Sequence, residues 1–545
     1  MAKLVLKNGK IYVEKGVFAQ AILMEDGVIS AVGADKEIAA LSGDAEIIDC
    51  GGKTVVPGFN DSHMHLLMVG IGMAQADITN ATSAEHLVEI GKRFLEEHPE
   101  AYKRGIQAVG WNQDLFTGDK RLPTRHDLDK ISKEIPIIME RVCGHVVTVN
   151  SKVLELMGIE KGAPQFPGGT WEKEESGEPN GILTELTCNR ANAVFKPYTD
   201  EEYEKMFLTA AEYALSRGIT SVQANDVGTA PLPGETTFRL IRNLYAQNRC
   251  KLRYRHQMSF SSCAAFAQWA ESEKENYLCD NDKLTLGPLK LFKDGSLGAR
   301  TATVRQEYRD DPGNFGVEAV SAAEMDEYCA IADKYDMQVV THVIGDKAIS
   351  DTIDSYEKVL RDGKNPLRHG LVHCQITDRP LLERIGADQL QVMAQPVFLD
   401  CDMHAIVSRC GEALSSTSYA FKTLADLGAQ VSFGTDSPVE DCNPFPNLYS
   451  AVTRKDKTGW PEGGFYPEEC VDIETAIDAY TLGSAYNEFQ EHRKGRLKPG
   501  YLADMVVLDT DIFTCDPMAI RNILPELTIV GGEVVWQAKS ADRHK

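Results

Sequence analysis

Short apolar runs separated by amphipathic segments dominate the second half of the chain. Segments with helical spacing, such as residues 324–335 and 349–360, lie between most of these runs. The runs begin near Ile219, Leu252, Leu286, Gln338, Gly370, Gln391 and Gln430, and a further run leads into His63. Eight strands that alternate with helices are typical of a (β/α)8 TIM barrel, so the sequence predicts an α/β fold of this kind.

The two ends of the chain resemble each other and differ from the middle. Both contain short β-branched runs broken by turn signals such as Asn8-Gly9 and Gly531-Gly532. Neither end is long enough to bury a core of its own. We therefore expect residues 1–57 and 490–545 to form one composite β-sandwich domain, with a barrel domain at 58–489 between them.

A long segment separates the first predicted barrel strand from the second. Residues 66–200 contain helix-like stretches and a loop rich in glycine and proline at 162–169. The segment is much longer than an ordinary connection, so it predicts an inserted α/β subdomain, placed to cap a site.

Charge limits the class of partner that we expect, and cysteine content indicates the compartment. The chain of 545 residues has 57 basic and 81 acidic side chains, a net charge of −24. An acidic surface repels nucleic acids and anionic membranes, so we expect a small-molecule substrate and neither of those partners. The 13 cysteines form no C-x-x-C pair, and the first residues lack a signal-peptide pattern, which favours a cytoplasmic protein with reduced thiols.

Side chains that bind metals follow the predicted barrel strands. Catalytic groups of such barrels lie at the carboxyl ends of the strands. Here five strands carry His63 and His65, then Lys290, His342, His373 and Asp436. A single histidine is more often a core residue, but this set in matching positions indicates a metal centre.

Longer motifs around these residues resemble the amidohydrolase superfamily, in the branch similar to N-substituted formamide deformylases. The resemblance extends from residue 57 nearly to the end of the chain. HxH and FGTDSPV are typical of the superfamily, whereas LKLFKDGSLGART and HVIGDKA are typical of this branch. The matching stretches are PGFNDSHMHL, GITSVQ, LKLFKDGSLGART, HVIGDKAI, RHGLVHC, FGTDSPV and GRLKPGYLADMVVLD.

The resemblance implies two divalent metal ions, with Zn²⁺ expected. His63 and His65 would hold the more buried ion together with Asp436, and His342 and His373 would hold the second. Lys290 would bridge the two ions as a carboxylated lysine, because an ammonium cannot bind a cation. Lys293 is the rival, and we expect it to be a solvated loop residue instead.

The resemblance implies a metal-dependent hydrolase that cleaves a non-peptide carbon–nitrogen bond. Paired cations lower the pKa of water, so a metal-activated hydroxide attacks the carbonyl carbon. Asp436 would accept the proton of the water as general base and return it to the departing nitrogen as general acid. The branch implies an N-substituted formamide or a similar N-acyl amide as the substrate.

Further candidates are less specific. His145, in a histidine–asparagine stretch found in this branch, would orient the substrate carbonyl; a structural role is the alternative. Trp111 and Phe116 would form a wall of the substrate pocket, although aromatic residues are more often core. Asp294 and Arg300 follow the fourth strand and would contact substrate or surround Lys290.

Two other functions fit the same fold. A mononuclear deaminase would need no bridging lysine, and a catalytically inactive scaffold would be expected to lose ligands. Relatives in the superfamily lead us to expect a homodimer.

Overall fold

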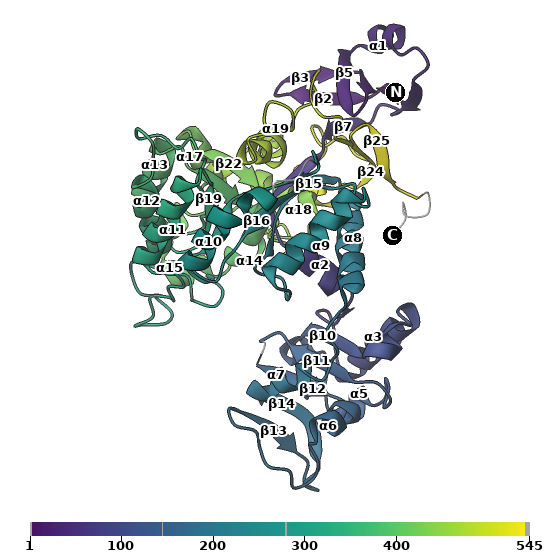
Figure 1. Ribbon diagram of the computed structural model, residues 1–545, viewed down its shortest axis with the longest axis vertical. Coiled ribbons are helices and arrows are strands. Elements are labelled where there is room, and N and C mark those ends of the chain that lie inside the picture. Colours follow the sequence, from purple (N-terminus) through teal and green to yellow (C-terminus); the bar gives the residue numbers. More distant parts are fainter. Residues whose placement is uncertain (1–2, 144, 278–280, 540–545) are drawn as a thin grey trace. The chain divides into compact units, whose positions relative to one another are not determined.

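The computed structural model describes residues 3–143, 145–277 and 281–539 (Figure 1). The chain divides into two compact units. Met1–Met68 and Leu208–Lys545 form the first, here called the barrel unit, and Val69–Phe207 form the second, here called the inserted unit. Among the described residues, no helix combines the length and the apolarity that crossing a membrane requires.

A parallel sheet of eight strands in sequential order forms the barrel, which confirms the predicted fold class. Seven of the eight have four to six residues and the second has nine, and residues 370–373 and 391–394 are entirely buried. Backbone hydrogen bonds from Asp436 N to His63 O (2.8 Å) and from His65 N to Ser437 O (2.7 Å) join the first strand to the segment after the last. The order is β8 (Phe59–Met64), β15 (Ile219–Val227), β16 (Arg253–Met258), β18 (Leu289–Phe292), β19 (Val339–Val343), β20 (Gly370–His373), β21 (Gln391–Ala394) and β22 (Gln430–Phe433).

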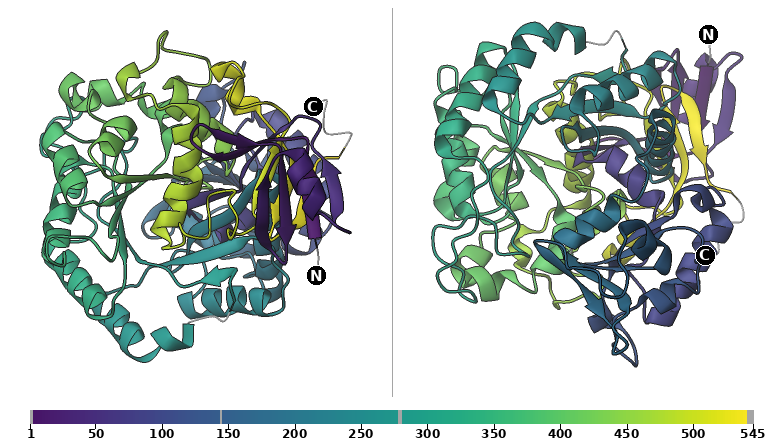
Figure 2. Two further views of the ribbon diagram at one scale, coloured as in Figure 1. Left: turned by 90° about the horizontal axis from the view of Figure 1, so that it is seen from above. Right: turned by 60° about the horizontal axis from the view of Figure 1, so that its bottom comes forward.

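Helices of the barrel unit lie outside these strands (Figure 2). Their starts follow capping rules: the Ser321 side chain accepts a hydrogen bond from Glu324 N at the start of α11 (Ala322–Lys334), and Asp378 does the same for Leu381 N at α13 (Arg379–Ala387). Between them lies α12 (Asp346–Glu357). The helices predicted at 324–335 and 349–360 correspond to α11 and α12.

Both termini contribute strands to one six-stranded sheet. In it β7 (Thr54–Pro57) pairs with β2 (Lys10–Glu14) on one side and with β23 (Met505–Leu508) on the other. A second sheet contains β1 (Lys3–Lys7) and three neighbours from the N-terminal segment. Buried side chains of both ends, among them Leu6, Ile11 and Met505, belong to one apolar cluster. The chain therefore enters the barrel directly from this sheet, since Gly58 alone separates β7 from β8.

The inserted unit has a six-stranded sheet of its own. Its central strands are β10 (Ile106–Trp111), β11 (Ile137–Arg141) and β12 (Val146–Val149), and α3 (Ala84–Glu97) contributes to the core. Helix α3 begins at Ser83, whose side chain accepts a hydrogen bond from His86 N.

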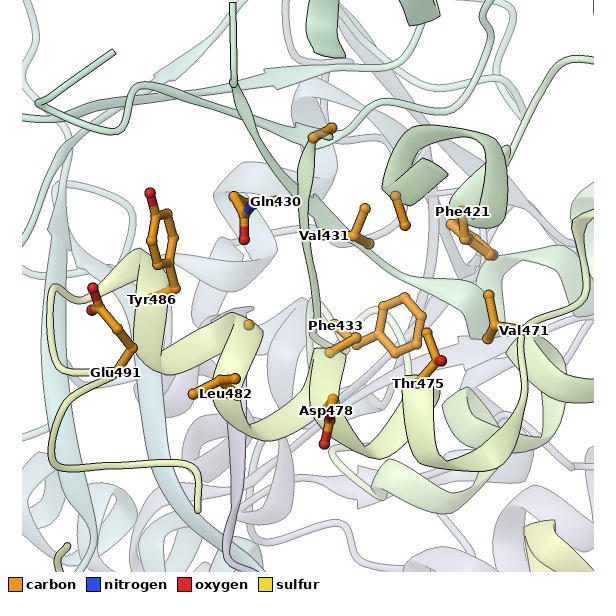
Figure 3. Close-up of a pocket in the computed structure, with 14 residues that line it drawn as sticks. Phe421, Gln430, Val431, Phe433, Val471, Thr475, Asp478, Leu482, Tyr486 and Glu491 are labelled. Atoms are coloured by element: carbon orange, nitrogen blue, oxygen red, sulfur yellow. The ribbon is translucent and has the colours of Figure 1, made fainter. Parts of the chain in front are cut away.

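A cavity of about 360 Å³ lies beside the last barrel strand (Figure 3). Phe421, Val471 and Leu482 line it together with Gln430 and Val431, the first residues of β22. Asp436 follows the other end of that strand, so this cavity is not where the predicted metal ligands gather.

Candidate metal centre

Three imidazole nitrogens face one carboxylate at the carboxyl ends of the barrel strands. Nε2 of His63 lies 3.3 Å and Nε2 of His65 lies 3.4 Å from Oδ1 of Asp436, and Nε2 of His373 lies 3.9 Å from Oδ2. One potential ligand atom from each of His63, His373 and Asp436 lies within 4.8 Å of the others. Three strand ends that are distant in sequence thus place four donors around one point.

Glutamine side chains orient two of these rings. Nδ1 of His63 is 2.6 Å from Oε1 of Gln257, and Nδ1 of His373 is 2.7 Å from Oε1 of Gln395. Because a glutamine oxygen only accepts, each Nδ1 must carry the proton, which leaves the lone pair of Nε2 for a cation. The sequence reasoning missed Gln257 and Gln395. Their positions on β16 and just after β21 were the available signal.

A backbone carbonyl orients His65 in the same way. Its Nδ1 lies 2.8 Å from the oxygen of Asn225. The side chain of His65 is 16% exposed and that of Asp436 is 12% exposed, whereas His63 and His373 are at most 2% exposed. The centre is therefore accessible from the side of His65 and Asp436.

The protonation states suit a cation site. Burial, with Lys290 nearby, lowers the pKa of both His63 and His342 to about 4, and burial holds the pKa of His373 well below its ordinary value. These rings are neutral at pH 7. Burial disfavours the charged form of Asp436, yet its contact with His63 and His65 holds its pKa well below the usual range.

His342 joins the group from β19. Its ring centroid is 4.5 Å from that of His373. Its Nε2 lies 3.0 Å from the carbonyl oxygen of Gly295 and 3.5 Å from Oδ1 of Asp294, so Nδ1 is the nitrogen left for a ligand. Asp294 also accepts backbone hydrogen bonds from Thr303, Ile344 and Gly345 at 2.8–3.0 Å. This carboxyl therefore fixes the loop beside His342, and burial raises its pKa to about 7.

Lys290 is fully buried on β18. Its Nζ lies 3.7 Å from the ring centroid of Phe292, and its hydrogen bond to Leu291 O is long, at 3.3 Å. Burial lowers the pKa of Lys290 to about 7, although Asp436 opposes this effect. A substantial fraction of the amine is therefore neutral at pH 7, and a neutral amine is the form that can react with carbon dioxide.

The prediction that Lys293 is solvated is wrong. This side chain is fully buried, and its ammonium group pairs with Glu318 and donates to Val320 O at 2.6 Å. The chain segment around residues 318–320 lies beside Lys293, with Ala319 N bonded to Lys293 O at 2.9 Å, and supplies these acceptors, which no local pattern reveals. The ammonium of Lys293 is therefore bonded to Glu318 and to the Val320 carbonyl.

The sequence reasoning also missed Asp61. Its carboxylate accepts hydrogen bonds from His63 N (3.1 Å), Thr435 N (3.1 Å) and Thr435 Oγ1 (2.6 Å), and it is fully buried. It therefore joins β8 to the segment that carries Asp436. A Cβ at Gly434 would lie 2.7 Å from Asp61 Oδ1, so a larger residue would not fit there. The alternation Asp61, His63, His65 on one strand face was the available signal.

The aromatic candidates lie in the core of the inserted unit. Trp111 and Phe116 are 0% and 2% exposed and belong to one apolar cluster, and the Trp111 indole donates to Met139 O at 2.9 Å. Core packing, the alternative considered above, accounts for their burial. Their role in substrate binding stays a prediction.

The two remaining candidates contact carboxylates. His145 is exposed, and its Nδ1 lies 3.1 Å from Oε2 of Glu185 in the inserted unit. Arg300 forms a bidentate pair with Asp310 at 3.1 and 2.6 Å. A direct contact of either residue with substrate also stays a prediction.

The donors of the barrel site fit a divalent metal ion. Neutral imidazoles with their second nitrogen hydrogen-bonded, next to an ionised carboxylate, are the ligands that such ions take in hydrolases. An α/β barrel with this donor set at the carboxyl ends of its strands defines a metal-dependent hydrolase. Residues 46–536 match the model of the amidohydrolase family, and the chain belongs to that family.

Known proteins agree with this assignment. YtcJ of Bacillus subtilis (strain 168) is 29% identical over 98% of this chain and 99% of its own length. The N-substituted formamide deformylase of Arthrobacter pascens is 25% identical over 95% of each chain. The crystal structure of an uncharacterized metal-dependent hydrolase from Pyrococcus furiosus is 30% identical, with a TM-score of 0.75 over 94% of this chain and 100% of its own. The predicted resemblance is confirmed, and the chain is a hydrolase that acts on carbon–nitrogen bonds.

Proposed function

We propose that this protein hydrolyses the amide bond of a small N-substituted formamide or a similar N-acyl amide. The observation that carries the proposal is the convergence of three Nε2 atoms on the carboxylate of Asp436. The similarity to the deformylase of Arthrobacter pascens supports the substrate class.

In this proposal the ligand set would hold two Zn²⁺ ions. His63, His65 and Asp436 would hold one, and His342 and His373 would hold the other. Lys290 would contribute as a carboxylated lysine, which forms when its neutral amine adds to carbon dioxide with formation of an N–C bond and release of one proton. When bound, the ions supply Lewis acidity and lower the pKa of water, so that hydroxide is available at neutral pH.

Asp436 moves the proton in the proposed reaction. Its ionised carboxylate accepts a proton from the attacking water as the water oxygen adds to the carbonyl carbon. The same oxygen atom then gives that proton to the amide nitrogen as the C–N bond breaks. A formamide yields formate and an amine. Nδ1 bonds to Gln257 and Gln395 keep the neighbouring imidazoles from rotating during these steps.

Metal analysis of the purified protein, combined with an amine-release assay on N-formyl and N-acyl amides with added zinc, tests this function. We expect two ions per chain and release of formate and amine in equal amounts. One ion per chain, unchanged in Lys290→Ala, with ammonia released from a ring substrate would instead support the mononuclear deaminase. Neither product from any substrate, with Asp436→Asn and His63→Ala leaving the metal content unchanged, would support the inactive scaffold.

A further inference from the structure

Four aromatic rings form a row across the metal centre. The centroids of Phe292 and His342 are 5.8 Å apart, those of His342 and His373 are 4.5 Å apart, and those of His373 and Phe398 are 5.9 Å apart. The rings come from the ends of β18, β19 and β20 and from η3 (Pro396–Phe398), which follows β21. The inner two rings are predicted metal ligands, and the outer two are partly exposed phenylalanines.

Phe398 is held firmly in this row. Its ring is nearly parallel to that of His373, with 19° between the planes. Its N–H bonds to Gln395 O at 3.1 Å, and the preceding N–H, of Val397, bonds to Oδ1 of the buried Asn447 at 2.8 Å. Since Gln395 also holds Nδ1 of His373, one short segment fixes the edge of that imidazole and covers its face.

Phe292, at the other end of the row, also contacts Lys290. Nζ of Lys290 lies 3.7 Å from its ring centroid, so any change of Phe292 also changes the surroundings of that lysine. Phe398 has no charged group over its ring among the cation–ring contacts of the described residues. It is therefore the ring whose contribution can be tested separately.

We propose that Phe398 is a specificity-determining residue that contacts a flat apolar substituent of the amide. The inference rests on the proposed function. The ring is apolar and partly exposed beside buried ligands. Covering it with an apolar group of the substrate removes apolar surface from water and so favours binding. A substrate whose carbonyl lies between His373 and Asp436 has Phe398 next to it, because the ring stacks on His373.

The test compares N-phenylformamide with N-methylformamide and reports the ratio of their kcat/KM values. In Phe398→Ala we expect this ratio to fall about tenfold, the usual scale for one apolar pocket contact. Phe398→Tyr keeps the ring and should keep the ratio. Phe18→Ala is the matched control, because Phe18 is a partly exposed phenylalanine (39%) on strand β3 (Val17–Ala19) of the terminal sheet.

Metal content is measured on every variant. An equal loss on both substrates in Phe398→Ala, with metal lost as well, would show that the ring only shields His373 and would overturn the inference. If the alanine variant does not fold, the same ratio and the metal content are measured on Phe398→Leu, which keeps apolar volume but has no flat ring. If the wild-type protein hydrolyses neither amide, the proposed function itself fails; if it hydrolyses both and the ratio never changes, only this inference fails.

Discussion

Replacing Gln395 by leucine tests whether the second hydrogen bond of a ligand imidazole matters. Leucine has a similar volume but removes the oxygen that lies 2.7 Å from Nδ1 of His373. A buried N–H left without an acceptor costs about 1–3 kcal/mol in the free energy of unfolding. Loss of such an orienting partner weakens metal binding by about 10–100-fold, or about 1.4–2.7 kcal/mol. The first estimate applies to folding of the metal-free protein and the second to metal binding, so the two are measured separately.

Metal affinity is measured by zinc titration against a competing chelator, and the free energy of unfolding by urea denaturation of the metal-free protein. Gln338→Leu is the matched control. Gln338 is also buried, accepts from Arg255 Nη2 at 3.1 Å and donates to Arg368 O at 2.6 Å, away from the predicted ligands. We expect Gln338→Leu to lower stability and to leave zinc affinity unchanged.

A Gln395→Leu protein that binds zinc as tightly as the wild type would refute the reasoning. It would mean that Nδ1 of His373 needs no acceptor for Nε2 to bind, and that the stack with Phe398 is enough to hold the ring. Gln257→Leu, which acts on His63 in the same way, gives an independent repetition.

Three further predictions concern single side chains. Asp436→Asn should lower kcat by about 10²–10⁴-fold while circular dichroism stays unchanged, because the amide cannot accept the water's proton; wild-type turnover would exclude Asp436 as the base. Lys290→Ala should lose the second ion in metal analysis by mass spectrometry, and retention of two ions would contradict the bridge. Burial, reinforced by Asp400, raises the pKa of Glu440 from 4.5 to about 7. The folded state therefore binds the extra proton, and stability falls as pH rises from 4.5 to 7. Glu440→Gln should remove this loss and raise the free energy of unfolding at pH 8, but not at pH 4, by at most about 3 kcal/mol. Urea denaturation at both pH values checks this, and an equal effect at both would refute it.

Local sequence patterns were sufficient for the barrel. Most barrel strands bury both faces and appear as short apolar runs, and each helix shows its own periodicity. The predicted ligands follow from the same pattern, because the carboxyl ends of parallel strands share one end of a barrel. Hence His63, His342 and Asp436 could be grouped although they lie far apart in the sequence.

Those local patterns could not predict long-range contacts. Lys293 looks like a loop lysine, yet a returning segment buries it against Glu318. Trp111 and Phe116 were predicted to form a pocket wall or to be core residues, and no local pattern indicated Phe398, the partly exposed ring that stacks on a predicted ligand. Gln257 and Gln395 have no motif of their own, since any strand can carry a buried glutamine.

The sequence by itself determined the class of this protein: an alternating α/β barrel with histidines and a carboxylate at its strand ends, in the amidohydrolase family. Only the tertiary structure decided which atom of each side chain faces the centre and which groups hold it there. The reason is physical. The type of donor is a property of one residue, but the direction of a donor depends on the hydrogen bonds and ring contacts that neighbouring strands supply, and these neighbours meet only when the sheet closes.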